Sequence, residues 1–308
     1  QWKKSFVFII LKKLNDKRGK INFMTQYNQE LFDRIDNYRD EVLNFLRSKG
    51  NYFYTNEINI EMGKYKINYH RWLHPMQGSW ETTELFTPQK LGYLKKIIKE
   101  NSVVLDIGAH TGNMSVAYSL FARKVISFEP NPSTFDVLNQ NSKLNRNIIP
   151  YNFGCSTEDG KMEFHYSDEG FNNGGLASTL DNGIGVTGHK VPIEVYCVNV
   201  NNLLKDLHSD DYDNISFIKI DCEGHDKEIL PTLKGIIEKN KPIIQTEIYD
   251  GLTDREKIEL IEVIDSLGYD CYNLTEANDN IDDLGEKITK DSVSDLSLLT
   301  GHNLICFP

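Results

Sequence analysis

Two glycines, an aspartate and a glutamate stand where two apolar runs of the sequence end, and together they could bind a nucleoside. The run at 103–107 leads into Gly108 and Gly112, which allow the backbone to turn tightly and to approach a ligand. The next run ends at Glu129, 21 residues after Gly108, where a carboxylate can accept both ribose hydroxyls. Asp106, just ahead of the turn, adds a second negative charge.

The residue types of this pattern favour one class of cofactor over another. A dinucleotide fingerprint needs a glycine at the position of His110, facing the pyrophosphate, so a nicotinamide cofactor is disfavoured. Asp106 and Glu129 make the pocket negative, which suits a cationic sulfonium better than a diphosphate. The pattern therefore favours S-adenosylmethionine. The alternative is that Asp106 and Gly108 only form a turn.

The elements that would position these residues can be read from residue 103 onward, where apolar runs of strand length alternate with helical patterns. The runs are 103–107, 124–128, 148–153, 215–220, 243–248, 269–272 and 303–307, and the helical patterns are 115–121, 133–144, 202–207, 227–237 and 254–267. This alternation predicts an α/β fold, a mainly parallel sheet with helices on both faces. Ligands of such sheets bind beyond the carboxyl ends of the strands.

The chain ahead of this unit has a different pattern. Residues 26–47 repeat apolar side chains at helical spacing, and residues 52–69 alternate around Met62-Gly63-Lys64 as a β-hairpin would. A short helix is expected after Pro88. We therefore predict a small α+β accessory region at 25–84, which caps or shapes the pocket, and a larger domain at 85–308.

The first 24 residues carry seven basic residues against one acidic residue, a net charge of +6, whereas residues 25–308 carry −17. Their apolar stretch at 6–11 is far shorter than the ~18 residues of a membrane span. No small-residue cleavage site follows it, which argues against a secretory signal. We expect upstream or fragment sequence, or a loose basic arm, rather than an amphipathic anchor.

Composition narrows the class of protein. The 308 residues are 39% hydrophobic and 26% charged, as in a soluble globular protein, and the net charge of −11 argues against general nucleic-acid or anionic-membrane binding. The five cysteines lack a C-x-x-C spacing and are expected to be buried free thiols. Free thiols are typical of a reducing compartment, so a cytoplasmic protein is expected.

Four segments together resemble the FkbM family of methyltransferases. They are residues 103–112, the Phe-Glu-Pro-Asn-Pro at 128–132, residues 141–145, and the Ile-Lys-Ile-Asp-Cys-Glu-Gly-His-Asp at 218–226. The resemblance runs from about residue 84 to about 275. It implies a Rossmann-like seven-stranded methyltransferase sheet, S-adenosylmethionine as cofactor, and O-methylation, often of sugars or small natural products.

On this resemblance the cofactor would contact the first two strand ends and one residue ahead of the first strand. The expected residues are Asp106, Gly108, His110, Thr111, Gly112, Asn113, Glu129, Pro130, Asn131 and Glu84. The chain departs from the family at His110, where an asparagine is usual. It also departs at Asn201, where an aspartate usually opens a helix, and asparagine caps a helix about as well.

Acidic side chains also follow the fourth and fifth strand runs. Because neighbouring strand ends lie close together, Asp221, Glu223, His225 and Glu247 are expected to converge over the methyl group of the cofactor. Methyl transfer to a hydroxyl is an in-line displacement that needs orientation and a base. We expect Asp221 to be a positioning residue beside the cofactor and either Glu223 or His225 to be the base.

Two alternatives remain for this cluster. Its carboxylates and His225 could hold a divalent metal that acidifies the acceptor, and such oxygen-rich ligands suit magnesium or calcium. Glu223 and Asp226 could instead only stabilise a helix N-terminus, which explains Asp226 well. Amino acceptors are less expected, because the Asp-Pro-Pro-Tyr type of motif does not follow the fourth strand run.

The glycine-rich segment 168–190 is interpreted as a lid over the acceptor, with a surface loop as the alternative. Trp72 and Trp80 could stack on a sugar or on adenine, or they could be core residues. The core interpretation is favoured for Trp72, and both alternatives remain for Trp80. The sequence thus predicts an S-adenosylmethionine-dependent O-methyltransferase for a hydroxyl of a sugar, glycan precursor or small natural product, with neither nucleic-acid binding nor stable membrane insertion. The alternatives are a nucleotide-sugar-modifying oxidoreductase, or a non-catalytic S-adenosylmethionine-binding protein of the same fold.

Overall fold

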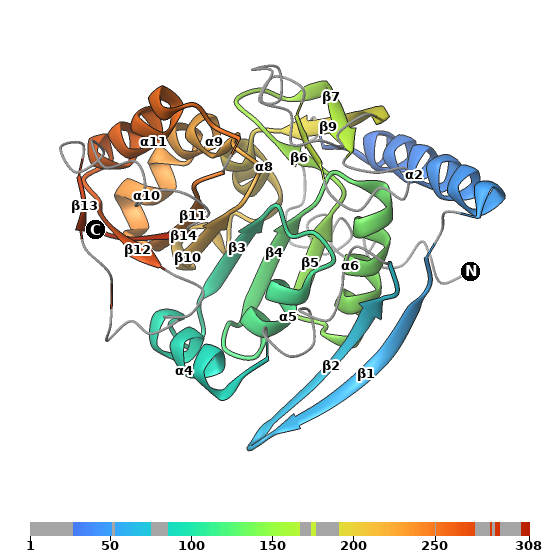
Figure 1. The fold of residues 1–308 in the computed structure, drawn as a ribbon, viewed down its shortest axis with the longest axis horizontal. Coiled ribbons are helices and arrows are strands. Elements are labelled where there is room, and N and C mark those ends of the chain that lie inside the picture. Colours follow the sequence, from blue (N-terminus) through green and yellow to red (C-terminus); the bar gives the residue numbers. More distant parts are fainter. Residues whose placement is uncertain are drawn as a thin grey trace, which may run out of the picture.

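The computed structural model describes residues 27–50, 53–74, 86–166, 174–176, 191–249, 251–274, 284, 287–289 and 303–308 of the chain. Its largest part is an eight-stranded sheet with the order β13-β12-β14-β11-β10-β3-β4-β5 (Figure 1). The strands are β3 (Val103–Ile107), β4 (Lys124–Phe128), β5 (Ile148–Tyr151), β10 (Ile215–Ile220), β11 (Ile243–Glu247), β12 (Asp270–Leu274), β13 (Lys287–Ile288) and β14 (Asn303–Phe307). The seven predicted runs all form strands of this sheet, and the short edge strand β13 was not expected.

The direction of the strands brings the predicted site residues to one edge. Strands β5, β4, β3, β10 and β11 are parallel neighbours, whereas β14 runs antiparallel to β11 and β12. The carboxyl ends of the five parallel strands therefore meet at the same edge of the sheet. This mixed α/β, Rossmann-like arrangement confirms the predicted fold class.

Helices cover both faces of the sheet, as the alternation of strand side chains requires. Val103, Leu105 and Ile107 face a core cluster that also contains side chains of the C-terminal helices, whereas Val104 faces a second cluster with the helices before and after β3. The helices are α2 (Gln29–Lys49), α4 (Pro88–Ile97), α5 (Asn113–Ser119), α6 (Pro132–Leu144), α8 (Val200–Leu207), α9 (Asp226–Thr232), α10 (Lys234–Asn240) and α11 (Asp254–Ser266). None of the helices in the described ranges is long and apolar enough to cross a lipid bilayer.

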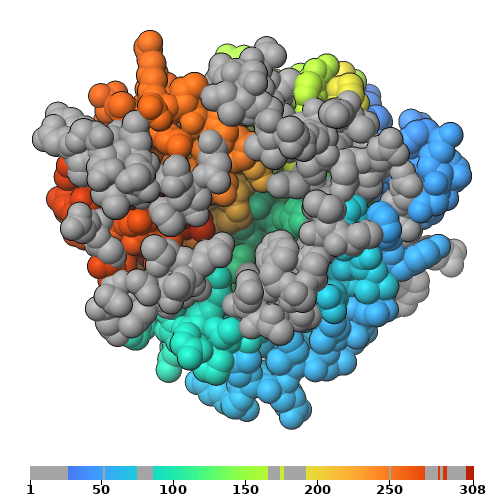
Figure 2. Space-filling model, viewed as in Figure 1, coloured from blue at the N-terminus to red at the C-terminus, as the bar shows by residue number. Residues whose placement is uncertain are grey.

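Two smaller sheets flank this body. A hairpin of β1 (Thr55–Met62) and β2 (Tyr65–Trp72) extends beside α6, and a four-stranded sheet has the order β6-β9-β7-β8. Its strands are β6 (Gly154–Cys155), β7 (Gly160–Tyr166), β8 (Gly174–Leu176) and β9 (Val191–Val198). The predicted N-terminal helix and hairpin are confirmed. In the space-filling view the blue hairpin and the orange C-terminal helices lie on opposite sides of the green centre (Figure 2).

Two expectations differ from the structure. The predicted helix at 227–237 is two helices, α9 and α10, which are separated at Leu233. Pro231 lies in the last turn of α9, where proline removes a donor and its ring crowds the carbonyl four residues earlier. Within the predicted lid, residues 174–176 form strand β8 against β7 rather than loop, and the rest of 168–190 lies outside the described residues.

Candidate active site

A cavity of about 280 Å³ lies at the carboxyl ends of the parallel strands, where the predicted site residues were expected. Its floor comes from the loops that follow β3, β4, β5 and β10. Phe164 of β7 and Leu176 of β8 also line it, so the small sheet covers part of the opening. Helix α2 supports that cover, since Leu46 packs with Phe164 and Leu176 in one apolar cluster.

The turn after β3 is shaped by a glycine that no other residue could replace without movement. Gly108 has a φ of 75°, and a Cβ at this position would lie 1.8 Å from the carbonyl oxygen of Asp221. The amides of Gly108 and Ala109 both donate to the Phe128 carbonyl, at 3.0 and 2.9 Å. The turn is thereby packed against the ends of both β4 and β10.

Glu129 is the carboxylate that the sequence predicted for the ribose. It lines the cavity but is nearly buried, and the amides of His110 and Asn131 donate to it at 2.8 Å each. The Thr134 hydroxyl donates to the same oxygen as Asn131, at 3.0 Å. Burial raises the pKa of Glu129 to about 7 despite these donors. A carboxylate has about four acceptor positions, so capacity for a ligand remains.

Asp106 lies beneath the turn rather than on the cavity lining. Its side chain is fully buried, the Ser115 hydroxyl donates to one oxygen at 2.5 Å, and burial raises its pKa. The other oxygen lies 3.9 Å from the Nζ atom of Lys219. Asp106 could therefore influence a ligand by charge or through the loop.

Lys219 lies within the FkbM-like segment 218–226, but no role was predicted for it from the sequence. Its Nζ donates to the Gly108 carbonyl at 2.9 Å and lies 3.0 Å from Oδ2 of Asp221. Burial alone would lower the pKa of Lys219, but Asp221 and Asp106 raise it, so the lysine is a cation in the cavity wall. A lysine within the mostly apolar run 215–220 was the feature of the sequence that could have identified this residue. It offsets part of the negative charge that the sequence predicted for the pocket.

Asp221 and Glu247 form a carboxyl pair with opposite pKa shifts. Burial would raise the pKa of Asp221, but the Lys219 ammonium and hydrogen bonding lower it below its ordinary value. The Asp221 charge, together with burial, raises the pKa of Glu247 well above the ordinary range. These opposite shifts favour the charge on Asp221 and the proton on Glu247. Of the two, only Asp221 lines the cavity.

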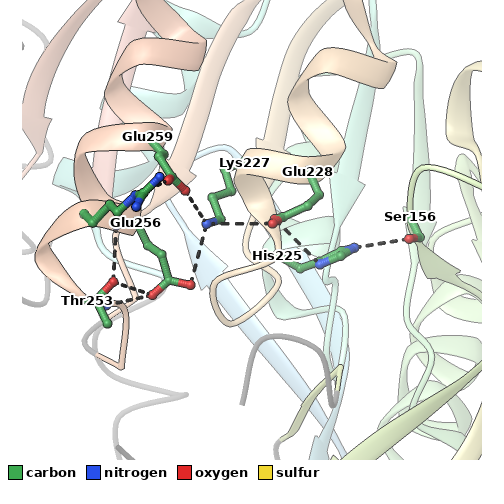
Figure 3. A network of polar contacts seen from close by, with 8 residues as sticks. Ser156, His225, Lys227, Glu228, Thr253, Glu256 and Glu259 are labelled. Carbon is green, nitrogen blue, oxygen red and sulfur yellow. Dashed lines mark hydrogen bonds and ion pairs between the residues drawn. The ribbon is translucent and has the colours of Figure 1, made fainter. Parts of the chain in front are cut away.

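Glu223 and His225 both line the cavity, but they differ in backbone conformation and in their contacts. Glu223 adopts a left-handed backbone with a φ of 52°, which is uncommon for this residue type. His225 lies with Nε2 3.2 Å from the Ser156 hydroxyl and Nδ1 3.7 Å from Oε2 of Glu228 (Figure 3). Burial lowers the pKa of His225 to about 4, with a smaller contribution from Lys227. The imidazole is neutral at pH 7, and both its nitrogens face protein groups.

Asp226 joins the two loops at the acceptor end. Its carboxylate accepts the Cys222 amide at 3.1 Å, the Thr246 hydroxyl at 2.7 Å and the Glu247 amide at 3.4 Å. Asp226 lies in the first turn of α9, as the helix N-terminus interpretation expected, but its hydrogen bonds join the loop after β10 to β11 rather than cap the helix. The side chains of Glu228, Lys227 and Glu259 continue a polar chain towards α11 (Figure 3).

The cavity thus brings together most of the predicted residues. Those that line it are Gly108, His110, Thr111, Asn113, Glu129, Pro130, Asn131, Asp221, Glu223 and His225. Asp106, Gly112 and Glu247 lie behind the lining, and Trp72 is a buried core residue. Glu84 and Trp80 lie outside the described residues. No group of three His, Cys, Asp or Glu side chains with the spacing of a metal site occurs in the described ranges.

Lys219→Met is expected to destabilise the protein by about 2 kcal/mol at pH 7, less than a fully buried pair would lose because 36% of the Asp221 side chain is exposed. The lowered pKa of Asp221 contributes stability above its ordinary value of 3.8, and this contribution is lost as the pH falls through the folded-state pKa. The deficit of the variant should therefore shrink below about pH 4. Urea unfolding of the wild type and the variant, at pH 7 and below about pH 4, measures the difference in free energy of unfolding.

The matched control for this ion pair is the double variant Lys219→Met with Asp221→Asn, which removes both charges. It should recover only part of the stability at pH 7, because Asp221, the carboxylate nearest to Lys219, is no longer left without its partner, whereas Asp106 still loses the nearby ammonium. An equal deficit at both pH values, or no recovery in the double variant, would contradict the ion-pair role.

Comparisons with known proteins give the chain's relatives. The methyltransferase FkbM domain matches residues 106–273. Over 166 residues the chain is 27% identical to the hexuronic acid methyltransferase AglP of Haloferax volcanii, a match that covers 53% of this chain and 62% of that protein. The fold resembles the methyltransferase FkbM of Methylobacillus flagellatus KT at a TM-score of 0.41 and 11% identity, over 74% of this chain and 57% of that one. For the precorrin-6y C5,15-methyltransferase of Geobacter metallireducens GS-15 the TM-score is 0.38 and the identity is 15%, over 73% of this chain and 89% of that one.

Proposed function

We propose a function on the basis of the family to which this chain belongs. The chain is a member of the FkbM methyltransferases, because their domain matches residues 106–273, more than half of its length. We propose that it transfers the methyl group of S-adenosylmethionine to a hydroxyl of a sugar, glycan precursor or small natural product. One observation carries this proposal. One cavity is lined both by Gly108 and Glu129, which were predicted to bind a nucleoside, and by the carboxylates of Asp221 and Glu223.

The residues at one end of the cavity fit the cofactor. Gly108 lets the loop after β3 pack directly against the Asp221 backbone, and residues 108–111 of this loop line the cavity, where a ligand can approach them. Glu129 has acceptor capacity left for a ribose hydroxyl. Phe153 and Leu176 offer apolar surface for a purine. The loop at 108–112 would hold the amino-acid part of the cofactor.

When bound, the cofactor would supply an activated methyl group. The chain itself would orient the acceptor and remove its proton. Asp221, held by Lys219, would accept a hydrogen bond from the acceptor hydroxyl and fix its direction. The Glu223 carboxylate would take the proton at a side-chain oxygen. His225 suits this role less, because both ring nitrogens face protein groups and its pKa lies at about 4.

The proposed acceptor class rests on two considerations. A relative of the chain is named as a hexuronic acid methyltransferase, which is a sugar-modifying enzyme. Acidic side chains such as Asp221 and Glu223 can accept hydrogen bonds from a polyol, and they would repel a carboxylate as the reacting group. We therefore propose that a hydroxyl rather than a carboxylate is methylated.

The test is transfer of isotope-labelled methyl from S-adenosylmethionine to a panel of neutral hexosides, hexuronic acids and nucleotide sugars, followed by mass spectrometry. A methyl ether stable to alkaline hydrolysis is the expected product. Label that alkali releases as methanol would identify a methyl ester and contradict the hydroxyl assignment. Retention of nicotinamide cofactor in place of S-adenosylmethionine would instead revive the oxidoreductase alternative.

A further inference from the structure

Asn141 of α6 connects the N-terminal hairpin to the cofactor loop through one buried amide. Its Oδ1 accepts the backbone amide of His70, in β2, at 2.6 Å. Its Nδ2 donates to the Thr111 carbonyl at 2.8 Å and lies 3.4 Å from the His70 carbonyl. Asn141 is fully buried, and Thr111 is 1% exposed and lines the cavity. The same side chain thus touches the hairpin on one side and the proposed cofactor site on the other.

Further contacts hold the loop between α6 and the hairpin. A Cβ at Gly112 would lie 2.5 Å from Cδ1 of Leu138, one turn ahead of Asn141, so the loop rests directly on the helix. On the other side the ring of Trp72, near the end of β2, lies 6.4 Å from the ring of His110. The loop between these contacts has left-handed backbone at His110 and Gly112. Glycine adopts this conformation freely, but at His110 it persists only where the surroundings hold it.

We propose that Asn141 is a positioning residue that couples the hairpin to the cofactor loop, so that the hairpin forms part of the cofactor site. This inference rests on the proposed function, because it assumes that the loop at 108–112 binds S-adenosylmethionine. It changes the role expected for the accessory region. Instead of covering an acceptor, the hairpin would hold the loop through His70 and Trp72 and so contribute to cofactor affinity.

The chain offers a matched control one turn along the same helix. Asn145 also joins α6 to the hairpin, with its Nδ2 donating to the Asn68 carbonyl at 3.0 Å. Its other contact is the Asn141 backbone carbonyl at 3.0 Å, within the helix. Asn145 therefore shares the link to β2 and is not among the residues that line the cavity. Because Asn141 is buried and Asn145 is only half-buried, a purely structural role predicts a larger loss of stability for Asn141 but no selective loss of binding. A positioning role adds a loss of cofactor affinity that is specific to Asn141.

The experiment compares wild type, Asn141→Ala and Asn145→Ala in the full chain, by calorimetric titration with S-adenosylhomocysteine and by thermal unfolding. Asn141→Ala should bind about tenfold to a hundredfold more weakly, because the Thr111 carbonyl and the His70 amide lose their buried partner. Asn145→Ala should lose stability but bind within about twofold of wild type. Equal affinities for all three proteins would overturn the inference and leave the proposed function intact. No binding by folded wild type would overturn both.

Hydrogen exchange of the wild type provides a second measurement in case Asn141→Ala does not fold. Bound S-adenosylhomocysteine should slow exchange in the peptide that covers 106–114 and also in the one that covers 65–72, because the His70 amide is bonded to Asn141. The hairpin tip at 58–64 serves as the internal control and should not change. Protection confined to 106–114 would contradict the coupling.

Discussion

Replacing Glu223 by glutamine is expected to slow methyl transfer by about 10²–10⁴-fold while leaving the affinity for S-adenosylhomocysteine unchanged. Glutamine keeps the size of the side chain and its capacity to accept a hydrogen bond, but it cannot take a proton from the acceptor hydroxyl. Glu223 already has a φ of 52°, and the two residue types share the cost of this conformation, so the comparison isolates the carboxylate. Single-turnover transfer of labelled methyl measures the rate.

The control for this prediction is His225→Gln. Because the imidazole is buried and hydrogen-bonded to Ser156, this variant should lose stability and show a smaller loss of rate than Glu223→Gln. The reverse order, with Glu223→Gln active and His225→Gln inactive but folded, would assign the base to His225. Loss of S-adenosylhomocysteine binding in Glu223→Gln would show that Glu223 acts on the cofactor rather than on the acceptor.

Gly108→Ala is expected to abolish cofactor binding and to destabilise the protein by more than about 3 kcal/mol. The methyl group would meet the Asp221 carbonyl oxygen at 1.8 Å, so β3 and β10 would have to separate at the cavity. The φ of 75° adds the cost of a left-handed backbone for a residue with a side chain. Urea unfolding and titration with S-adenosylhomocysteine measure the two effects.

Gly63→Ala is the matched control, since it separates the backbone cost from the collision. Gly63 lies between β1 and β2 with a φ of 58°, and a Cβ there would meet nothing within 4 Å. Its replacement should cost about 1–2 kcal/mol and leave binding unchanged. If Gly108→Ala behaved like Gly63→Ala, the close approach of the two loops would not be needed for the site.

The sheet could be predicted because its strands carry a strong local signal. Strands β3 and β10 are short apolar runs that are buried on both faces, and the residues that end them are turn formers or acidic. The two-residue strand β13 has no comparable apolar run, and it is a strand only because it pairs with β12. It could therefore not be predicted. The break between α9 and α10 was missed because one proline, Pro231, overrode a continuous helical pattern.

The site was predictable where chemistry follows the strand ends directly and was missed where contacts cross the fold. Gly108, Glu129 and Asp221 each stand at a strand end, so topology alone brings them together. Lys219 reaches the Gly108 carbonyl from the neighbouring strand, and Asn141 reaches Thr111 from α6. Neither contact follows from a helical or strand spacing of residues in the sequence. The placement of Asp106 behind the lining also depends on Ser115 of α5, which only the packed structure specifies.

Our proposal also assigns the N-terminal region a more specific role than the predicted cap. Its helix α2 supports the small sheet over the cavity through Leu46, and its hairpin supports the cofactor loop through His70. The two elements therefore act at opposite sides of the same site. The metal alternative and the contribution of Glu84 stay predictions from the sequence.

The central claim is that this cavity binds S-adenosylmethionine with its ribose on Glu129. Calorimetric titration with S-adenosylmethionine and S-adenosylhomocysteine at pH 8, above the pKa of about 7, tests it on wild type, Glu129→Ala and the exposed control Glu158→Ala. The account predicts that both ligands bind the wild type and the control, and that Glu129→Ala weakens binding by about 1–3 kcal/mol. Absence of binding by folded wild type, or equal affinity of Glu129→Ala, would contradict it.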